Sequence, residues 1–314
     1  MMNTQKKTVS TLQPSVGTPR FRRLLTKYGP GVGFLLPFFV LFFVFTILPV
    51  FTAVGMSLTY YDLINPPRFT GLTNFVKLLL EDDVFLISLR NTFVFAAITG
   101  PIGYVLSFAS AWIIDQFRAR NALALVFYAP TLVTATAISV VWLYLFSGDR
   151  YGLINNVLLQ LAVINEPIQW TTNPATIMPV IIIVQLWMSM GNGFLVFLAG
   201  FKNISPEIYE AGAIDGVKNR TQQLFMLTLP MMKPQLLYGA ITSIVSAFAV
   251  FDIAVSIAGM PSPDYAAHTI VAHLYDHAFI RFEMGYASGI AVILFLITYL
   301  LGQLCMRLLS SKEE

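Results

Sequence analysis

The sequence predicts an all-α integral membrane protein with about six transmembrane helices. The chain has 314 residues, of which only 11% are charged, against roughly 25% in soluble domains. Its mean hydropathy is +0.71. Six stretches are long and apolar enough to cross a bilayer, since a spanning helix needs about 20 mostly apolar residues. The alternating pattern of a membrane β-barrel is absent from the sequence. Lipid is therefore the expected solvent for most of the chain.

The predicted spans cover residues 34–58, 92–114, 123–146, 177–199, 236–258 and 286–308. A 25-residue first span is too long for the apolar core of a secretory signal, and no clear small-residue cleavage site follows it. We therefore expect residues 1–30 to form a basic N-terminal tail and residues 31–310 to form a six-helix transmembrane domain.

The distribution of basic residues predicts the orientation. Fourteen of the 19 Lys and Arg residues lie in the two terminal segments and in the connections 115–122 and 200–235. Because Lys and Arg accumulate on the cytoplasmic side, both termini are expected inside the cell. The net charge of +3 comes from these flanks, which argues against a nucleic-acid-binding protein.

A polar, charged segment of 28 residues, EIYEAGAIDGVKNRTQQLFMLTLPMMKP, separates the fourth and fifth spans. Ser205 followed by Pro206 is typical of a helix start, which predicts a first short helix over residues 206–214. Gly216 can adopt positive φ and predicts a sharp turn. A second helix is expected over residues 219–227 and should end at Leu229–Pro230.

One face of the first short helix carries Glu207, Glu210 and Ile214, which recur at i, i+3 and i+7. The small residues Ala211 and Gly212 lie beside them and would let another surface approach. The residue pattern of this segment is equally compatible with two interpretations. The segment is either a docking surface for another protein or an amphipathic elbow on the lipid surface.

All three histidines of the chain lie in the connection 259–285. His273 and His277 are four residues apart, the spacing of a metal-binding pair on a helix. Leu274 stands where a zinc-protease motif would have its Glu. We therefore expect a solvated or interfacial helix at this position.

Motifs within this segment resemble a known family. "EAGAIDG", with "LTLP" about a dozen residues later, resembles the EAA loop of ABC-importer permeases. The fuller "IYEAGAIDG…LTLP…P" and the last-span sequence "GYASGIAVILFLI" resemble the binding-protein-dependent carbohydrate branch that includes the maltose permease subunits. "MMKPQLLYGA" and "DYAAHTI…RFEMGYAS" look most similar to permeases for polysaccharides or complex oligosaccharides. The resemblance covers about residues 34–309.

The sequence departs from the family pattern at two points. Gly212 stands where the family usually has Ala, and the spacing from Gly216 to Pro230 is one residue longer than in most members. The extra residue is expected just after the turn, in residues 217–219.

The resemblance implies a type I ABC-importer permease fold, in which the EAA loop of residues 204–234 is a coupling helix that fits a groove on a cytoplasmic ATPase. Carried over to this chain, the coupling residues are Glu207, Glu210, Ala211, Gly212, Asp215, Gly216 and Pro230. ATP and Mg would then be bound by partner ATPase subunits and not by this chain, which has no phosphate-loop motif. The chain would be a multi-pass subunit of the bacterial cell membrane and not an enzyme.

The resemblance also implies three kinds of partner: a second homologous permease, two copies of the ATPase and an extracytoplasmic solute-binding protein. The imported substrate would be a carbohydrate, either an oligosaccharide or a polysaccharide fragment.

Polar residues inside the spans are candidates for the substrate path. Gln185, Ser189 and Asn192 recur at i, i+4 and i+7 and share one helix face. Trp187 could supply an aromatic surface for a sugar ring, as could Trp142. The alternative is that the three polar residues only form hydrogen bonds with neighbouring helices, as polar groups in membrane bundles often do.

Asp252 lies inside the predicted fifth span, where a carboxylate facing lipid would cost about 2.5–3.5 kcal/mol. We therefore expect it to face a cavity, water or another helix. It is also the only ionisable residue well inside a span. The alternative function, a secondary transporter driven by an ion gradient, would need more such groups.

Overall fold

The computed structural model describes residue 31 and residues 33–310, except for the side chains of residues 192, 309 and 310. The chain divides into two compact units, residues 1–52 and 53–314. The first unit contains most of a 25-residue apolar helix, Gly33–Ser57, which includes a π-helical turn, η1 (Phe43–Ile47), and α2 (Leu48–Ser57). Its bounds agree with the predicted first span to within one residue.

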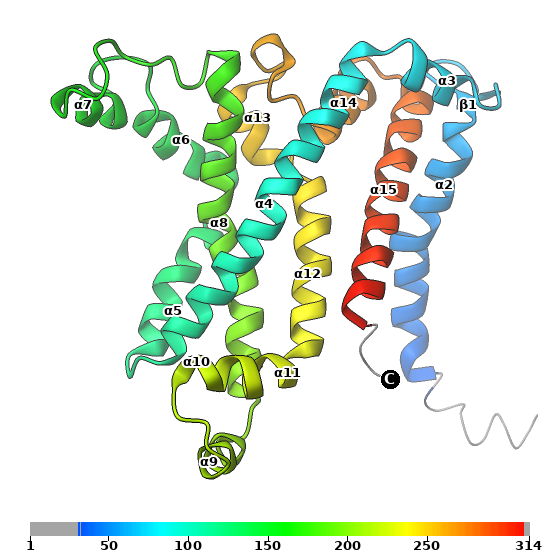
Figure 1. Ribbon diagram of the computed structural model, residues 1–314. Coiled ribbons are helices and arrows are strands. Elements are labelled where there is room, and N and C mark those ends of the chain that lie inside the picture. The colour runs from blue at the N-terminus through cyan, green and yellow to red at the C-terminus, as the bar shows by residue number, and fades with distance from the viewer. Residues whose placement is uncertain (1–30, 32, 311–314) are drawn as a thin grey trace, which may run out of the picture. The chain divides into compact units, whose positions relative to one another are not determined.

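Four further long helices in the second unit confirm the second, fourth, fifth and sixth spans: α4 (Asp83–Asp115), α8 (Pro174–Lys202), α12 (Lys233–Phe248), which leads into α13, and α15 (Met284–Ser310) (Figure 1). Helix α4 begins nine residues before its predicted span and α8 three residues before its own. Asp82 caps α4 by accepting a hydrogen bond from Phe85 N at 2.8 Å, and Asn173 caps α8 through Ala175 N at 2.9 Å. These polar caps satisfy backbone groups outside the lipid.

The third span is not one helix, and the prediction of a continuous span over 123–146 was wrong. The segment is divided into α5 (Arg120–Tyr128), a 3₁₀ turn η2 (Ala129–Leu132) and α6 (Ala135–Leu145), and the two halves meet at 95°. Pro130 lies in the turn and cannot donate a helical hydrogen bond. Thr134 then starts the second half by accepting a hydrogen bond from Ala137 N at 3.4 Å.

The fifth span is interrupted too. Helix α12 ends at Phe248, and a short helix α13 (Asp252–Ala258) follows after non-helical residues at Val250 and Phe251. The carbonyl of Val250, freed by the interruption, accepts a hydrogen bond from Thr269 Oγ1 at 3.0 Å. Non-helical backbone at membrane depth is tolerated where such partners exist.

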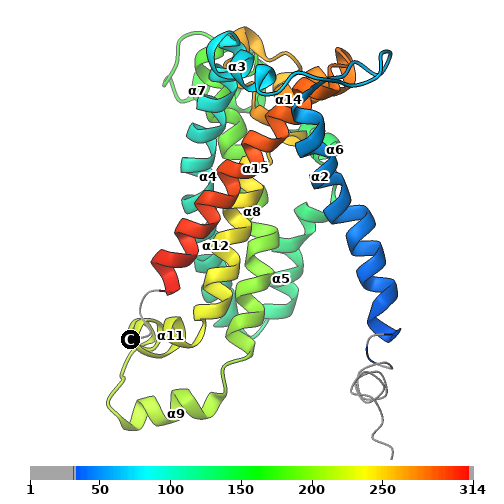
Figure 2. The same ribbon diagram turned by 90° about the vertical axis from the view of Figure 1, so that its right-hand side faces the viewer.

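The remaining elements gather at the two ends of the second unit (Figures 1 and 2). One end, which we call the α14 end, carries a two-stranded antiparallel sheet of β1 (Thr59–Tyr60) and β2 (Arg68–Phe69). The same end carries short helices: α3 (Thr73–Leu80), α7 (Leu153–Gln160), η4 (Pro263–Tyr265), α14 (Ile270–Tyr275) and the π-helical η5 (Asp276–Ile280). The other end, the α9 end, carries α9 (Pro206–Ile214), α10 (Arg220–Gln223), the π-helical η3 (Leu224–Thr228) and α11 (Leu229–Met231).

A close crossing of α4 over α8 forms the centre of the second unit. A Cβ atom on Gly103 would lie 2.7 Å from Ser189 Oγ, and one on Gly193 would lie 2.9 Å from Ser107 Oγ. Ser107 Oγ also lies 2.9 Å from the carbonyl of Ser189, to which it donates across the crossing. Small residues and hydroxyl hydrogen bonds of this kind hold membrane helices together.

The sidedness of the two ends can be tested by labelling single cysteines in a Cys305→Ser background. Cysteine at exposed Glu166, in the connection before α8, should react with a membrane-impermeant reagent in intact cells. Cysteine at exposed Asp215, after α9, should react only after permeabilisation. The reverse pattern would contradict the orientation predicted from the basic residues.

Candidate functional site

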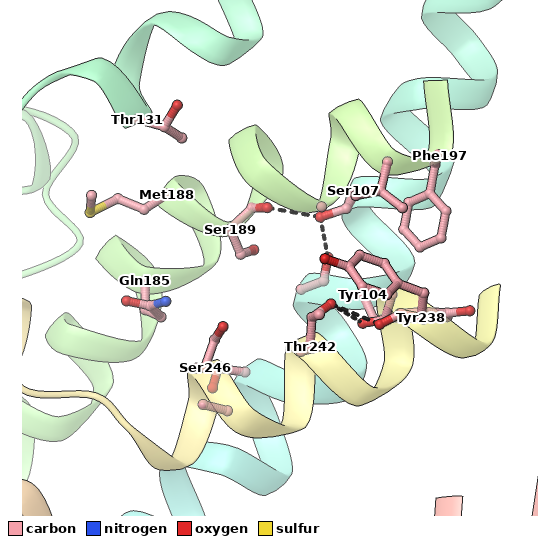
Figure 3. Close-up of a pocket in the computed structure, with 17 residues that line it drawn as sticks. Tyr104, Ser107, Thr131, Gln185, Met188, Ser189, Phe197, Tyr238, Thr242 and Ser246 are labelled. Atoms are coloured by element: carbon pink, nitrogen blue, oxygen red, sulfur yellow. Dashed lines mark hydrogen bonds between the residues drawn. The ribbon is translucent and has the colours of Figure 1, made fainter. Parts of the chain in front are cut away.

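A cavity of about 440 Å³ lies between α4, α8 and α12, next to the α4–α8 crossing (Figure 3). Its lining is rich in hydroxyl groups and includes one amide. The polar lining residues are Thr99, Tyr104, Ser107, Thr131, Gln185, Ser189, Tyr238, Thr242, Ser243 and Ser246. None of the lining residues that the structure describes carries a charge. The cavity is therefore suited to a solute that is polar but uncharged.

Most of the hydroxyl groups at the cavity donate to backbone carbonyls, either of their own helix or of a neighbouring one. Ser189 Oγ donates to Leu186 O at 2.8 Å, and Thr242 Oγ1 lies 2.9 Å from Tyr238 O. These bonds use the hydroxyl protons but leave oxygen lone pairs that can accept. The Gln185 amide makes no hydrogen bond to any residue the structure describes, so its donors and acceptor are available to a solute.

The structure brings two of the predicted path residues, Gln185 and Ser189, into the cavity. Ser189 also contributes to the helix crossing, so it both lines the cavity and takes part in a hydrogen bond between helices. The side chain of Asn192 lies outside the described residues. Trp187 does not line the cavity, contrary to its expected role: its ring packs edge-on against Trp142, with centroids 5.4 Å apart.

Asp252 lies within the apolar stretch 233–258 that forms the fifth span, as expected, but the helix is interrupted before it. Because α12 ends at Phe248, Asp252 is the first residue of α13. It is exposed and does not line the cavity. At the first position of a helix, a carboxylate is stabilised by the unpaired backbone N–H groups, so it needs no buried partner there.

Sequence reasoning missed the residues that α12 contributes. Tyr238, Thr242 and Ser246 all line the cavity and recur every four residues, the spacing of one helix face. The Tyr238 side chain is 59% exposed, so its ring is accessible. Their spacing along the sequence is of the same kind as that of Gln185 and Ser189 on α8, so this face of α12 could have been predicted from the sequence. Thr131 could not have been found this way, because it reaches α8 only through the unpredicted bend at η2.

The segment at the α9 end has the predicted plan of two short helices and a glycine turn. Helix α9 covers Pro206–Ile214 as expected, and Gly216 adopts φ +96°. Ser205 has the backbone conformation of an N-cap, but its side chain makes no capping hydrogen bond. The second helical stretch does not end at Leu229–Pro230. It continues one residue further, to Met231, as part of an uninterrupted helical run through α10, η3 and α11.

Internal contacts fix the shape of this segment. Tyr209 OH lies 3.2 Å from Thr228 Oγ1, which joins α9 to η3. Val217 is buried, and its N–H donates to Gly212 O at 2.9 Å, which closes the turn around Gly216. Asn219 accepts from Gln222 N at 2.8 Å and so caps α10. The segment therefore presents a defined surface.

The exposed face of α9 carries Glu207, Glu210, Ala211 and Ile214, and the Ile214 side chain is 87% exposed. This face therefore offers a partner one large apolar side chain beside carboxylates. Gly212 was expected to let a partner protein approach α9, but it does not lie on the exposed face. It is buried, and a Cβ there would lie 2.5 Å from Leu227 Cδ1, so its small size serves packing within the chain.

Gly216→Val should loosen this segment. No heavy atom lies within 4 Å of a Cβ at Gly216, so the cost comes from the positive φ alone, about 1–2 kcal/mol. We expect faster trypsin cleavage at the neighbouring Lys218 and Arg220. Ala213→Val, at an exposed helical position of α9, is the matched control and should change cleavage little. Equal rates in the two variants would show that the turn does not need glycine.

The family described as "Binding-protein-dependent transport system inner membrane component" matches residues 101–312. The probable ABC transporter permease protein YesP of Bacillus subtilis is 31% identical over 90% of this chain and 93% of the relative. The lactose transport system permease protein LacF of Rhizobium radiobacter is 31% identical over 86% of this chain and 90% of the relative.

The arabinooligosaccharides transport system permease protein AraP of Bacillus subtilis is 28% identical over 88% of each chain. Among solved structures, a chain of a bacterial ABC transporter involved in the import of alginate superposes with a TM-score of 0.78. That match covers 94% of this chain and 100% of the other at 19% identity, which supports the fold alone.

These matches agree with the arrangement of long apolar helices and confirm the predicted permease fold. The predicted alternative, an ion-driven secondary transporter, is not supported. The chain belongs to the family of inner-membrane permease components of binding-protein-dependent ABC importers, which are transport subunits and not enzymes.

Proposed function

We propose that this permease imports an uncharged oligosaccharide through the cavity between α4, α8 and α12. The observation that carries the proposal is the lining: hydroxyl groups, one amide and tyrosine rings, without a charged side chain among the described lining residues. Relatives named for lactose, arabinooligosaccharides and diacetylchitobiose support a sugar substrate. An acidic polysaccharide would call for basic groups, which the described lining lacks.

The cavity can recognise a sugar in two ways. The free amide of Gln185 donates and accepts, so it matches the paired hydroxyl groups of a pyranose. The exposed ring of Tyr238 offers an apolar surface for a sugar face, the role that the sequence suggested for Trp187. A volume of about 440 Å³ is in the ordinary range of small-molecule sites and would hold part of an oligosaccharide at a time.

The exposed face of α9 is proposed to dock on a separate ATPase. Glu207, Glu210 and Asp215 form an acidic surface around Ile214, and a basic groove on the partner would complement it. Asp215 caps the C-terminal end of α9, where a negative charge is unfavourable in the isolated chain. A cationic partner would remove that cost. Two ATPase copies would bind the ATP and Mg, one beneath each permease chain.

The coupling segment is continuous with the cavity wall. Helix α8 leads into α9 through buried Ile204, and η3 and α11 lead directly into α12. Because α8 and α12 also line the cavity, a displacement of α9 would be passed to the two helices that shape the substrate path. A second homologous permease would supply the other half of the path, and an extracytoplasmic binding protein would deliver the sugar.

Gln185→Ala should reduce transport while the complex still assembles. Loss of one or two hydrogen bonds to a sugar, about 1–1.5 kcal/mol, corresponds to roughly a tenfold lower rate at limiting substrate. Uptake of a labelled oligosaccharide into proteoliposomes that contain the whole importer measures this. Gln160→Ala, at an exposed position on α7, is the control and should transport normally. Unchanged uptake by Gln185→Ala would place the substrate path elsewhere.

Glu210→Lys should uncouple the ATPase. It would place a like charge against the proposed basic surface, and such contacts cost several kcal/mol, so ATPase capture should fall by more than about 100-fold. Co-purification with the ATPase measures the effect, and Glu166→Lys, in the connection between α7 and α8, is the charge-matched control. Normal ATPase capture together with normal uptake by Glu210→Lys would overturn the docking assignment.

A further inference from the structure

A cluster of potential metal ligands lies at the α14 end, away from the cavity and from α9. Asp82 precedes α4, His273 lies in α14 and His277 in η5. One ligand atom from each of the three residues lies within 4.8 Å of the others. His273 is 2% exposed and His277 6%. The expectation of a solvated helix here was therefore wrong: α14 packs against α4 and α15, which buries His273, and η5 packs against α15, with His277 buried.

Neighbouring side chains orient these ligands. The Nδ1 atom of His277 lies 2.6 Å from Glu283 Oε2. Because an ionised carboxylate can only accept, Nδ1 carries the proton and Nε2 keeps its lone pair. Tyr286 OH donates to Asp82 Oδ2 at 2.6 Å. Carboxylates that hold the second nitrogen of a ligating histidine, and hydrogen bonds to ligating carboxylates, are the usual surroundings of protein metal sites.

A second observation points to a missing ligand. Nδ1 of His273 is buried and has no hydrogen-bond partner among the residues the structure describes, while Nε2 lies 2.9 Å from Asp82 Oδ2. A buried imidazole nitrogen without a partner is costly and requires an explanation, such as a bound ion. His273 supplies one nitrogen to the cluster, and the unpartnered Nδ1 shows that hydrogen bonds within the described residues do not satisfy the ring.

A polar pocket of about 490 Å³ opens beside the cluster and gives a route for an ion. Acidic residues outnumber basic ones in its lining, which includes Glu81, Asp82, Asp83, Glu283, Lys77 and Arg281. Arg281 is already paired with Asp276 at 2.7 Å. The remaining negative charge would raise the local concentration of divalent cations.

We propose that Asp82, His273 and His277 bind a divalent transition-metal ion of the zinc type. Two imidazole nitrogens and one carboxylate oxygen suit Zn²⁺, Co²⁺ or Ni²⁺ better than Mg²⁺ or Ca²⁺, which prefer oxygen ligands alone. A tetrahedral site with bonds of roughly 2.0–2.1 Å needs ligand atoms about 3.3 Å apart, so small side-chain rotations complete it. The ion would tie the start of α4 to α14 and η5, segments about 190 positions apart in sequence.

The test uses the whole importer, stripped with a chelator, dialysed to equilibrium against Zn²⁺ and analysed for metal content. The wild-type complex should bind one more Zn²⁺ per copy of this chain than the His277→Ala complex, and Co²⁺ should give the ligand-field absorption of a low-coordinate site. Asp82→Asn retains an N-cap for α4, so it tests the ligand without removing the cap. We expect its Zn²⁺ affinity to fall at least about tenfold.

Asp83→Asn is the matched control, because Asp83 lines the same pocket but lies outside the donor set. It should bind Zn²⁺ like the wild type. Equal Zn²⁺ content in the wild-type, His277→Ala and Asp82→Asn complexes would overturn the proposal and leave the cluster as a hydrogen-bonded network between helices. Loss of Zn²⁺ binding in Asp83→Asn but not in Asp82→Asn would also overturn the assigned ligands.

Discussion

The close crossing of α4 and α8 is the contact on which the rest of the structure depends. Lipid gives no hydrophobic force between helices, so close packing and hydrogen bonds must hold them together. The crossing is reciprocal: Gly103 of α4 faces Ser189 of α8, and Gly193 of α8 faces Ser107 of α4. These four residues also line the cavity. The contact that holds the helices together therefore also sets the position of the cavity wall.

The two interrupted spans shape the cavity around this crossing. The bend between α5 and α6 brings Thr131 close to α8: a Cβ on Gly191 would lie 2.0 Å from Thr131 Cγ2. The interruption after α12 places Asp252 in α13, and the residues of α12 that line the cavity are uncharged. The Thr269 hydroxyl compensates the interruption after α12 by donating to the freed Val250 carbonyl. Thr92 on α4 accepts from Ile270 N at 2.9 Å, at the start of α14. Irregular backbone thus lies where protein groups can satisfy it.

The sequence predicted what depends on local chemistry and missed what depends on tertiary contacts. Apolar length located the spans, and the Ser-Pro start with a glycine turn located α9 and Gly216. The helix interruptions were missed because apolar composition continues across both. Trp187 was expected to contact the sugar, but its ring packs against Trp142. The spacing of residues along a helix does not show which neighbouring side chain an aromatic ring contacts. The burial of His273 depends on a pairing with Asp82, almost 200 residues away, which no local pattern reveals.

A comparison of two alanine substitutions one turn apart on α4 tests the central role of the crossing most directly. A Cβ on Gly103 would lie 2.7 Å from Ser189 Oγ and 3.2 Å from its Cβ, whereas no atom lies within 4 Å of a Cβ on Gly100. The thermal unfolding midpoint of the purified importer should therefore fall in Gly103→Ala. It should stay equal or rise slightly in Gly100→Ala, because alanine favours a helix over glycine. Equal midpoints in the two variants would contradict a crossing that depends on close approach at Gly103.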